Sequence, residues 1–239
     1  MRIDIWSDVV CPWCYIGKRR LETALQNGWA DRNDVEVVYH SFELDPSSPR
    51  EATQTVAEHL GQKYGGGAAA GQAMIDRVEA VAAEEGLVFR LGEAKRGNTV
   101  DAHRLLHLAL EQGGPELQGR LKEALLAAYF LRAENPADHD TLAALADETG
   151  LDPARTRAVL GSDEYADSVE ADVRQAVAYG ATGVPFYVID NRYGISGAQP
   201  ADVFVETLRR ADADAGRLVT VATQTDGSHD DCGPDGCAT

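Results

Sequence analysis

The chain has 239 residues, with 22 lysines and arginines against 39 aspartates and glutamates, so its formal net charge is −17. This length suits one large domain, or a core domain that carries an insertion. The acidic charge argues against nucleic acid or an anionic membrane as a main partner, because both are polyanions. No apolar run approaches the roughly 18 residues of a membrane helix, and the N-terminus does not resemble a secretory signal. We therefore expect a cytoplasmic protein without a membrane partner.

The first 50 residues predict a strand, a helix and a second strand. Residues 3–6 have the pattern of a short strand, and residues 35–42 have that of another. Between them, from Cys11 onward, apolar residues recur at helical spacing. This order is typical of the opening of a parallel α/β sheet.

The middle of the chain has an almost entirely helical pattern. One β-like stretch lies at residues 87–90, and clusters of glycine and proline separate the helices. Asn98 and Asp101 predict a capped start for the helix that carries His103 and His107. The expected helices cover residues 52–64, 71–85, 99–112, 115–133, 138–149, 153–160 and 163–180.

The β pattern returns after Gly183. Residues 186–189 predict a strand, 190–194 a turn, 195–196 a short partner strand, and a last helix begins at 200 and ends near 211. An all-helical segment inserted in a small α/β sheet is the simplest architecture that fits this order. We predict a sheet domain of residues 1–50 and 180–215, a helical domain of residues 51–179 and a flexible tail of residues 216–239.

Two of the four cysteines lie at the predicted junction of strand and helix, in the segment Cys11-Pro12-Trp13-Cys14. On the first turn of a helix, this spacing brings two sulfurs close enough for a disulfide. The free N–H groups of the helix start favour a thiolate, which is the form that attacks disulfides. Half of a zinc site is the alternative, but its two other ligands would have to come from far along the chain. The pattern favours redox chemistry.

The other two cysteines, Cys232 and Cys237, lie in the acidic tail. Three interpretations stay open: unused exposed thiols, a metal site with His229, or an accessory redox pair that reaches Cys11. The redox interpretation is favoured, because the intervening Gly-Pro-Asp-Gly segment predicts a turn.

Two other groups of polar residues allow a plain structural interpretation. His103 and His107 share a helical face but lack the glutamate and third ligand of a metal motif, so we expect structural histidines and no metal site. Asp8, just before the cysteines, is either a cap or loop residue or a carboxylate that aids proton transfer from Cys14.

Separate motifs along the chain occur in the order of one known family. They are the segments 7–17 (SDVVCPWCYIG), 98–104 (NTVDAHR), 183–188 (GVPFYV) and 196–199 (SGAQ). Together they resemble the DsbA-like thioredoxin superfamily, and within it the FrnE-like cytoplasmic branch. The similarity spans about residues 3–212. It implies a thioredoxin fold interrupted by an inserted all-helical domain, and thiol–disulfide oxidoreductase activity.

The resemblance also implies roles for individual residues. Cys11 would be the nucleophile, Cys14 the resolving thiol, and Pro185 the cis-proline that faces the pair across the active site. The expected partners are protein dithiols and disulfides, with glutathione as a possible co-substrate and no bound cofactor. The residues expected to contact substrate are Trp13, Val184, Asn98, His103 and Ser196.

Two departures from the redox interpretation stay open. Hydroxychromene-carboxylate isomerases and kappa-class glutathione transferases share the fold, with a serine at the position of Cys11, and a redox-linked chaperone is the other possibility.

The Pro12-Trp13 pair between the cysteines differs from the Pro-His pair of the periplasmic oxidant DsbA. Unlike a histidine, Trp13 cannot add positive charge beside the thiolate. Because the cytosolic glutathione pool would keep even a strongly oxidising pair mostly reduced, net reduction or shuffling of disulfides is expected for a cytoplasmic protein.

Overall fold

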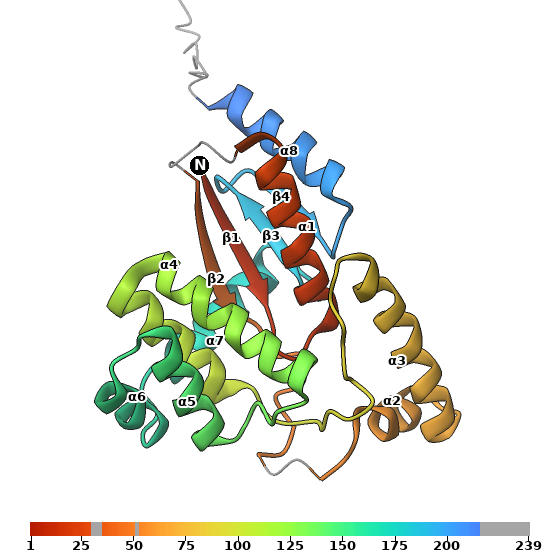
Figure 1. Cartoon of the computed structure of the whole chain (residues 1–239). Helices are drawn as coiled ribbons and strands as arrows, with labels where there is room; N and C mark the ends of the chain where they lie inside the picture. Colours follow the sequence, from red (N-terminus) through yellow and green to blue (C-terminus); the bar gives the residue numbers. More distant parts are fainter. Residues whose placement is uncertain (30–34, 51–52, 216–239) are drawn as a thin grey trace, which may run out of the picture.

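The computed structural model describes residues 1–29, 35–50 and 53–215. A mixed four-stranded sheet in the order β2-β1-β3-β4 forms its centre (Figure 1). β1 is parallel to β2 and antiparallel to β3, and β3 is antiparallel to β4. The two ends of the chain therefore combine in one sheet. The strands are β1 (Arg2–Ser7), β2 (Glu36–Ser41), β3 (Phe186–Ile189) and β4 (Tyr193–Ser196).

Both faces of the sheet are covered by helices. Successive side chains of a strand point to opposite faces, and β1 has apolar side chains on both faces. Ile3 and Ile5 of β1 pack with helices α1 (Pro12–Trp29) and α8 (Ala201–Asp214). Trp6 points to the other face and packs with Ala176 of α7 (Ala166–Ala178). This alternation explains why β1 is buried along most of its length.

All the helices described between β2 and β3 form the expected insertion. In Figure 1, α2 and α3 lie together on one side of the molecule and α4, α5 and α6 on the other. Thr55 and Glu58 form a capping box at the start of α2, and Asp138 and Asp152 cap α5 and α6. No helix in the described residues is long and apolar enough to cross a membrane. The remaining bounds are α2 (Val56–Tyr64), α3 (Gly67–Glu84), α4 (Val100–Arg132), α5 (His139–Thr149) and α6 (Pro153–Leu160).

The β-like stretch predicted at residues 87–90 is not a strand. The backbone N–H of Leu87 donates to Ala82 O at 2.9 Å, and the N–H of Arg90 donates to Phe130 O at 2.7 Å. Phe89 stacks on Phe130 with ring centroids 4.6 Å apart. Leu87 and Phe89 are thus buried against α4, whereas Val88 between them is 78% exposed.

The helices predicted at 99–112 and 115–133 form one element, α4, with a kink. Gly113 and Gly114 have non-helical dihedral angles, and Gly114 has a φ of 65°, which glycine adopts without strain. The predicted cap of this helix is only partly right. Asn98 accepts a bond from Val100 N at 2.9 Å, but the capping position belongs to Thr99.

The predicted turn between the last two strands is shorter than expected. β4 begins at Tyr193, because Asp190 and Asn191 both have positive φ and complete a tight turn.

Candidate active site

The two cysteines expected to form the redox pair lie where β1 leads into α1. Cys11 directly precedes the first helical residue, Pro12, and the N–H of Cys14 donates to Cys11 O at 3.0 Å. Both cysteines are free thiols, and they are 3% and 4% exposed. A proline fits the first position of a helix because its missing N–H has no partner to lose there. The pair therefore sits on the first turn of α1, as the sequence predicts.

Residues from the far end of the chain face this pair. The Val184–Pro185 peptide bond is cis, as expected from the resemblance. The thiol of Cys11 donates to the carbonyl oxygen of Val184 at 3.5 Å. The loop before β3 thus completes the site opposite the start of α1.

The two thiols differ in their surroundings. Burial raises the pKa of Cys14 well above its ordinary value, and so do the hydrogen bond and the charge interaction with Cys11. The positive charge of Lys122 and the backbone N–H of Asp8 act in the opposite direction. Burial therefore disfavours the thiolate form of Cys14, whereas Cys11 lies beside the pocket described below.

Asp8 is a buried carboxylate with several donors. It accepts bonds from Val9 N at 2.7 Å and Leu44 N at 2.8 Å, and lies 3.3 Å from His103 Nε2. Burial raises the pKa of Asp8, but these partners outweigh it and lower the pKa. Burial lowers the pKa of His103. Asp8 thus joins the loops after β1 and β2, which favours the structural interpretation of this carboxylate.

Lys122 of α4 is a buried cation that sequence reasoning missed. Its side chain is 1% exposed, and its Nζ donates to Ser7 O at 3.4 Å and lies 5.7 Å from the ring centroid of Tyr39. Burial lowers the pKa of Lys122 to about 8. A signal was available, since Lys122 is spaced four, three and seven residues from the buried residues Gln118, Leu125 and Tyr129. We call Asp8, His103 and Lys122 the cysteine cluster.

A second buried charged group lies between the sheet and α7. His40 Nε2 is 2.7 Å from Asp4, and its Nδ1 is 2.9 Å from Asp172. Trp6 stacks on His40 with centroids 4.4 Å apart. Burial lowers the pKa of His40, but the two carboxylates outweigh it and raise the pKa to about 9. His107 is 3.1 Å from Asp172, a structural position of the kind expected. We call Asp4, His40 and Asp172 the sheet cluster.

A pocket of about 410 Å³ opens beside the redox pair. Cys11, Trp13 and Val184 line one end of it, and Trp13 is 40% exposed. Helices α2 and α3 supply an apolar wall that includes Leu60 and Ile75. The pocket therefore joins Cys11 to an apolar surface of the helical insertion.

Three residues expected to contact substrate do not line this pocket. His103 is completely buried against Asp8. Asn98 donates to the carbonyls of Pro46 and Ser48 at 3.4 and 3.3 Å, and so holds a loop. Ser196 is exposed on β4, opposite Phe186. The accessory pair, Cys232 and Cys237, lies outside the described residues. Within the described ranges, no three histidine, cysteine or acidic side chains gather as metal ligands.

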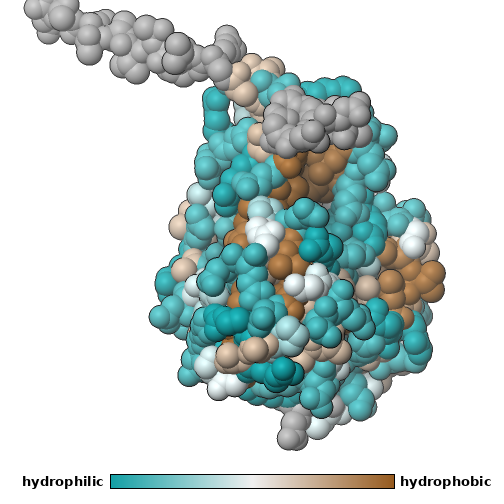
Figure 2. All heavy atoms as spheres, turned by 60° about the vertical axis from the view of Figure 1, so that its left-hand side comes forward, coloured by the Kyte–Doolittle hydropathy of each residue, from teal (hydrophilic) through white to brown (hydrophobic). Residues whose placement is uncertain are grey.

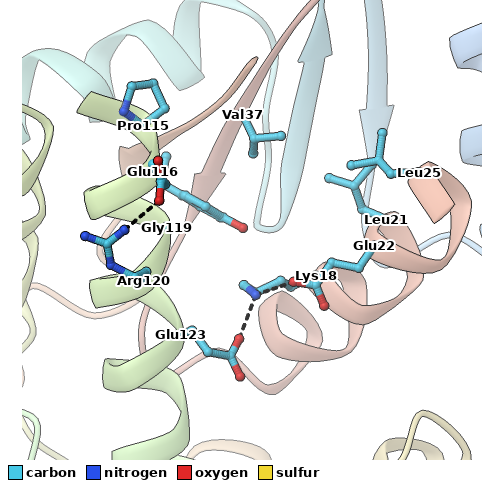
Figure 3. Close-up of a pocket in the computed structure, with 11 residues that line it drawn as sticks. Lys18, Leu21, Glu22, Leu25, Val37, Pro115, Glu116, Gly119, Arg120 and Glu123 are labelled. Atoms are coloured by element: carbon cyan, nitrogen blue, oxygen red, sulfur yellow. Dashed lines mark hydrogen bonds and ion pairs between the residues drawn. The ribbon is translucent and has the colours of Figure 1, made fainter. Parts of the chain in front are cut away.

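A second pocket, of about 480 Å³, lies between α1, β2 and α4. Figure 2 shows the strip of hydrophobic residues sunk in this face, and Figure 3 shows the ion pair of Lys18 with Glu123 across the pocket. Neither redox cysteine lines it. The pocket beside Cys11 is therefore the better candidate for substrate.

The fold and the site define a thioredoxin-like protein with a buried dithiol at a helix start. The chain belongs to the DSBA-like thioredoxin domain family, whose model matches residues 2–209. A probable DsbA oxidoreductase from Streptomyces coelicolor is 44% identical to it, with a TM-score of 0.84 over 100% of this chain and 99% of that one. The predicted family and fold are thus confirmed, while the FrnE-like branch stays a prediction.

Two more distant structures share the fold alone. The cytosolic disulfide reductase DsbM from Pseudomonas aeruginosa, solved with GSH, is 17% identical, with a TM-score of 0.59 over 88% of this chain and 100% of that one. A 2-hydroxychromene-2-carboxylate isomerase is 15% identical, with a TM-score of 0.63 over 91% and 100% of the two chains. Proteins named as a disulfide reductase and as an isomerase therefore share this fold.

Proposed function

We propose that the chain is a thiol–disulfide oxidoreductase in which Cys11 attacks and Cys14 resolves. The observation that carries the proposal is the asymmetry of the pair: both thiols are buried, but Cys11 lines the pocket at the helix start and Cys14 does not. The Cys11 thiolate attacks a substrate disulfide, forms a mixed disulfide and releases one substrate thiolate. Cys14 then attacks Cys11 Sγ, and the second substrate thiolate leaves. The substrate disulfide is reduced by two electrons, and the Cys11–Cys14 pair is oxidised.

The proposed substrates are protein disulfides and dithiols. The apolar wall of the pocket suits an apolar side chain near the substrate cysteine, and Trp13 supplies further apolar surface at its rim. We also propose that the backbone of Val184 pairs with an extended substrate segment, as an added strand does. Asn98, His103 and Ser196 support the site from outside the pocket in this proposal.

The direction of electron flow follows from the proposed cytoplasmic location. At the cytosolic glutathione poise, a pair as oxidising as about −120 mV is almost fully reduced, so net disulfide reduction or shuffling is favoured. Glutathione is the proposed source of electrons and a possible co-substrate. In this scheme, residues 1–50 and 180–215 form the redox domain, and residues 51–179 the helical domain that shapes the pocket.

The glutathione-dependent isomerase activity is the less favoured alternative. The resemblance places a serine at position 11 in that group, whereas this chain has a cysteine there and a second cysteine one helical turn later. A chaperone role is compatible with the same pocket and does not require the thiols.

Turnover of insulin disulfides by the full chain tests the proposal. We expect Cys11→Ser to abolish reduction, and Cys14→Ser to accumulate a mixed disulfide at Cys11 that mass spectrometry detects. A chain with both Cys232→Ser and Cys237→Ser removes two thiols but leaves the pair on α1, and altered turnover in this chain would support the accessory redox pair expected from the sequence. Full activity of Cys11→Ser would refute the redox proposal.

A further inference from the structure

A lysine that no described acidic side chain contacts is buried near the two cysteines of α1. Lys122 comes from α4 of the helical insertion, and its side chain is 1% exposed. In the described part of the chain, its ammonium has one hydrogen-bond acceptor, Ser7 O at 3.4 Å, and the ring of Tyr39 at 5.7 Å. A carbonyl and an aromatic ring offer only partial negative charge. Direct contacts therefore leave the formal charge of Lys122 without a counter-ion.

The neighbouring carboxylates are already engaged with other donors. Glu123, the next residue on α4, pairs with Lys18 at 2.6 Å (Figure 3). It also pairs with Arg19 and accepts a bond from Tyr15 at 2.7 Å. The carboxylate of Asp8 accepts two backbone N–H bonds and lies against His103, as described above. Neither carboxylate contacts the ammonium of Lys122.

The remaining groups that can carry negative charge near Lys122 are the two thiols. Cys14, Asp8 and Cys11 attract its charge, in that order of strength, whereas Lys18 of α1 opposes it. His103 of α4 also interacts with it. Tyr39 of β2 stays neutral, since burial raises the pKa of its phenol. A thiolate of the redox pair is thus the anion that the surroundings of Lys122 lack.

We propose that Lys122 is a positioning residue of the redox centre, whose buried ammonium is the counter-ion of the cysteine thiolates and chiefly of Cys14. Its catalytic consequence rests on the proposed function. In the resolving step, the Cys14 thiolate attacks Cys11 Sγ, the Cys11–Cys14 bond forms, and the bond to the substrate sulfur breaks with its electron pair on the substrate thiolate. The proton that Cys14 loses passes to water, and the departing thiolate takes one up.

The physical reason is that charges interact strongly where water is excluded. A thiolate beside a buried ammonium costs less than an isolated thiolate, so Lys122 stabilises the reduced form of the pair. The coupling acts in both directions, because each charge stabilises the other. Forming the disulfide removes the thiolates, and the ammonium of Lys122 should then lose its proton more easily.

The variant Lys122→Met tests this coupling, because it keeps the length of the side chain and removes the charge. We expect the equilibrium of the pair with glutathione to shift about tenfold toward the disulfide, which lowers the reduction potential by about 30 mV. In a Cys11→Ser background, we expect alkylation of Cys14 at pH 8 to slow about tenfold. Arg120→Gln is the matched control, since Arg120 lies on the same helix but is 52% exposed and pairs with Glu116. It should change neither measurement.

Two results would overturn the proposal. One is a folded Lys122→Met chain with the wild-type equilibrium and an unchanged pH profile of Cys14 alkylation. The other needs no variant: nuclear magnetic resonance of the Lys122 ammonium in the wild-type chain should give a lower pKa with the disulfide formed than with it reduced. Equal values in the two states contradict the coupling. If Cys11→Ser keeps insulin reduction, the proposed function fails, but the resonance measurement still decides the role of Lys122.

Discussion

The cysteine cluster and the sheet cluster are both buried and charged, yet they are paired very differently. In the sheet cluster, His40 lies between Asp4 and Asp172 and stacks on Trp6, so its positive charge has two direct carboxylate partners. In the cysteine cluster, Lys122 has one weak bond to a carbonyl and contacts no carboxylate of the described residues. The opposite pKa directions of His40 and Lys122 follow from this difference.

This difference predicts that the sheet cluster acts mainly on the stability of the fold and the cysteine cluster mainly on the chemistry of the thiols. A buried ion pair with complete partners joins α7 to the sheet, and removing one partner leaves an uncompensated charge. A buried charge with incomplete partners costs free energy, which is tolerated where the charge assists a reaction. The two clusters therefore respond in opposite ways to substitution and to pH.

The largest expected effect is the loss of Asp172. In Asp172→Asn, His40 keeps its charge but loses one carboxylate, and Ser41 N and His107 lose a partner as well. We expect the free energy of unfolding to fall by about 3 kcal/mol, with turnover per folded molecule unchanged. Urea denaturation measures the first and insulin reduction the second. A change of less than about 1 kcal/mol would show that the sheet cluster does not stabilise the fold.

The pH dependence of stability should have opposite signs in the two clusters. The folded-state pKa of His40, about 9, lies above its ordinary 6.5, so its stabilisation is complete below pH 6.5 and lost as pH rises to 9. The pKa of Lys122 is lowered from 10.5 to about 8. The free-energy cost of burying its ammonium is therefore complete below pH 8 and disappears as the pH rises to 10.5.

Denaturation curves from pH 6 to 10 check this expectation. In His40→Gln, the decline in stability between pH 6.5 and 9, on the order of 2 kcal/mol in the wild type, should be absent. An identical slope in His40→Gln and wild type would mean that another group titrates.

A smaller effect of opposite sign is expected from Lys122→Met. Since the folded state no longer buries an ammonium with incomplete partners, we expect stability at pH 7 to rise by about 1.5 kcal/mol. Thermal unfolding of the reduced chain measures it. A loss of stability similar to that of Asp172→Asn would show that the two clusters do not differ in this way.

The smallest effect is expected at the exposed edge of the sheet cluster. Arg2 pairs with Asp4 and Glu36, but its side chain is 48% exposed. Because solvent screens such pairs, Arg2→Met should change the free energy of unfolding by at most about 0.5 kcal/mol. The same denaturation assay compares it with Asp172→Asn, and equal losses would contradict the dependence on burial.

The local features of the site could be predicted from sequence because they depend on neighbours in the chain. Cys11, Pro12 and Cys14 fall on the first turn of α1, since a proline before an apolar helical pattern marks a helix start. The cis form of the Val184–Pro185 bond was expected only through the family resemblance, because few X-Pro bonds are cis. The β-like stretch at 87–90 is not a strand, because alternate apolar residues such as Leu87 and Phe89 can also be buried against helices.

The sequence by itself determined the β-α-β start, the helical insertion, the return to strands and the placement of Cys11 and Cys14 at a helix start, because hydrophobic period, turn residues and spacing are local properties. Only the tertiary structure decided what surrounds that pair. Lys122 lies more than 100 positions from Cys14 in the chain, and His40 is separated from Asp172 by 132. Such partners meet because packing α4 and α7 against the sheet brings them together. Whether a buried charge stabilises or destabilises the fold depends on these long-range contacts, which a local sequence pattern does not predict.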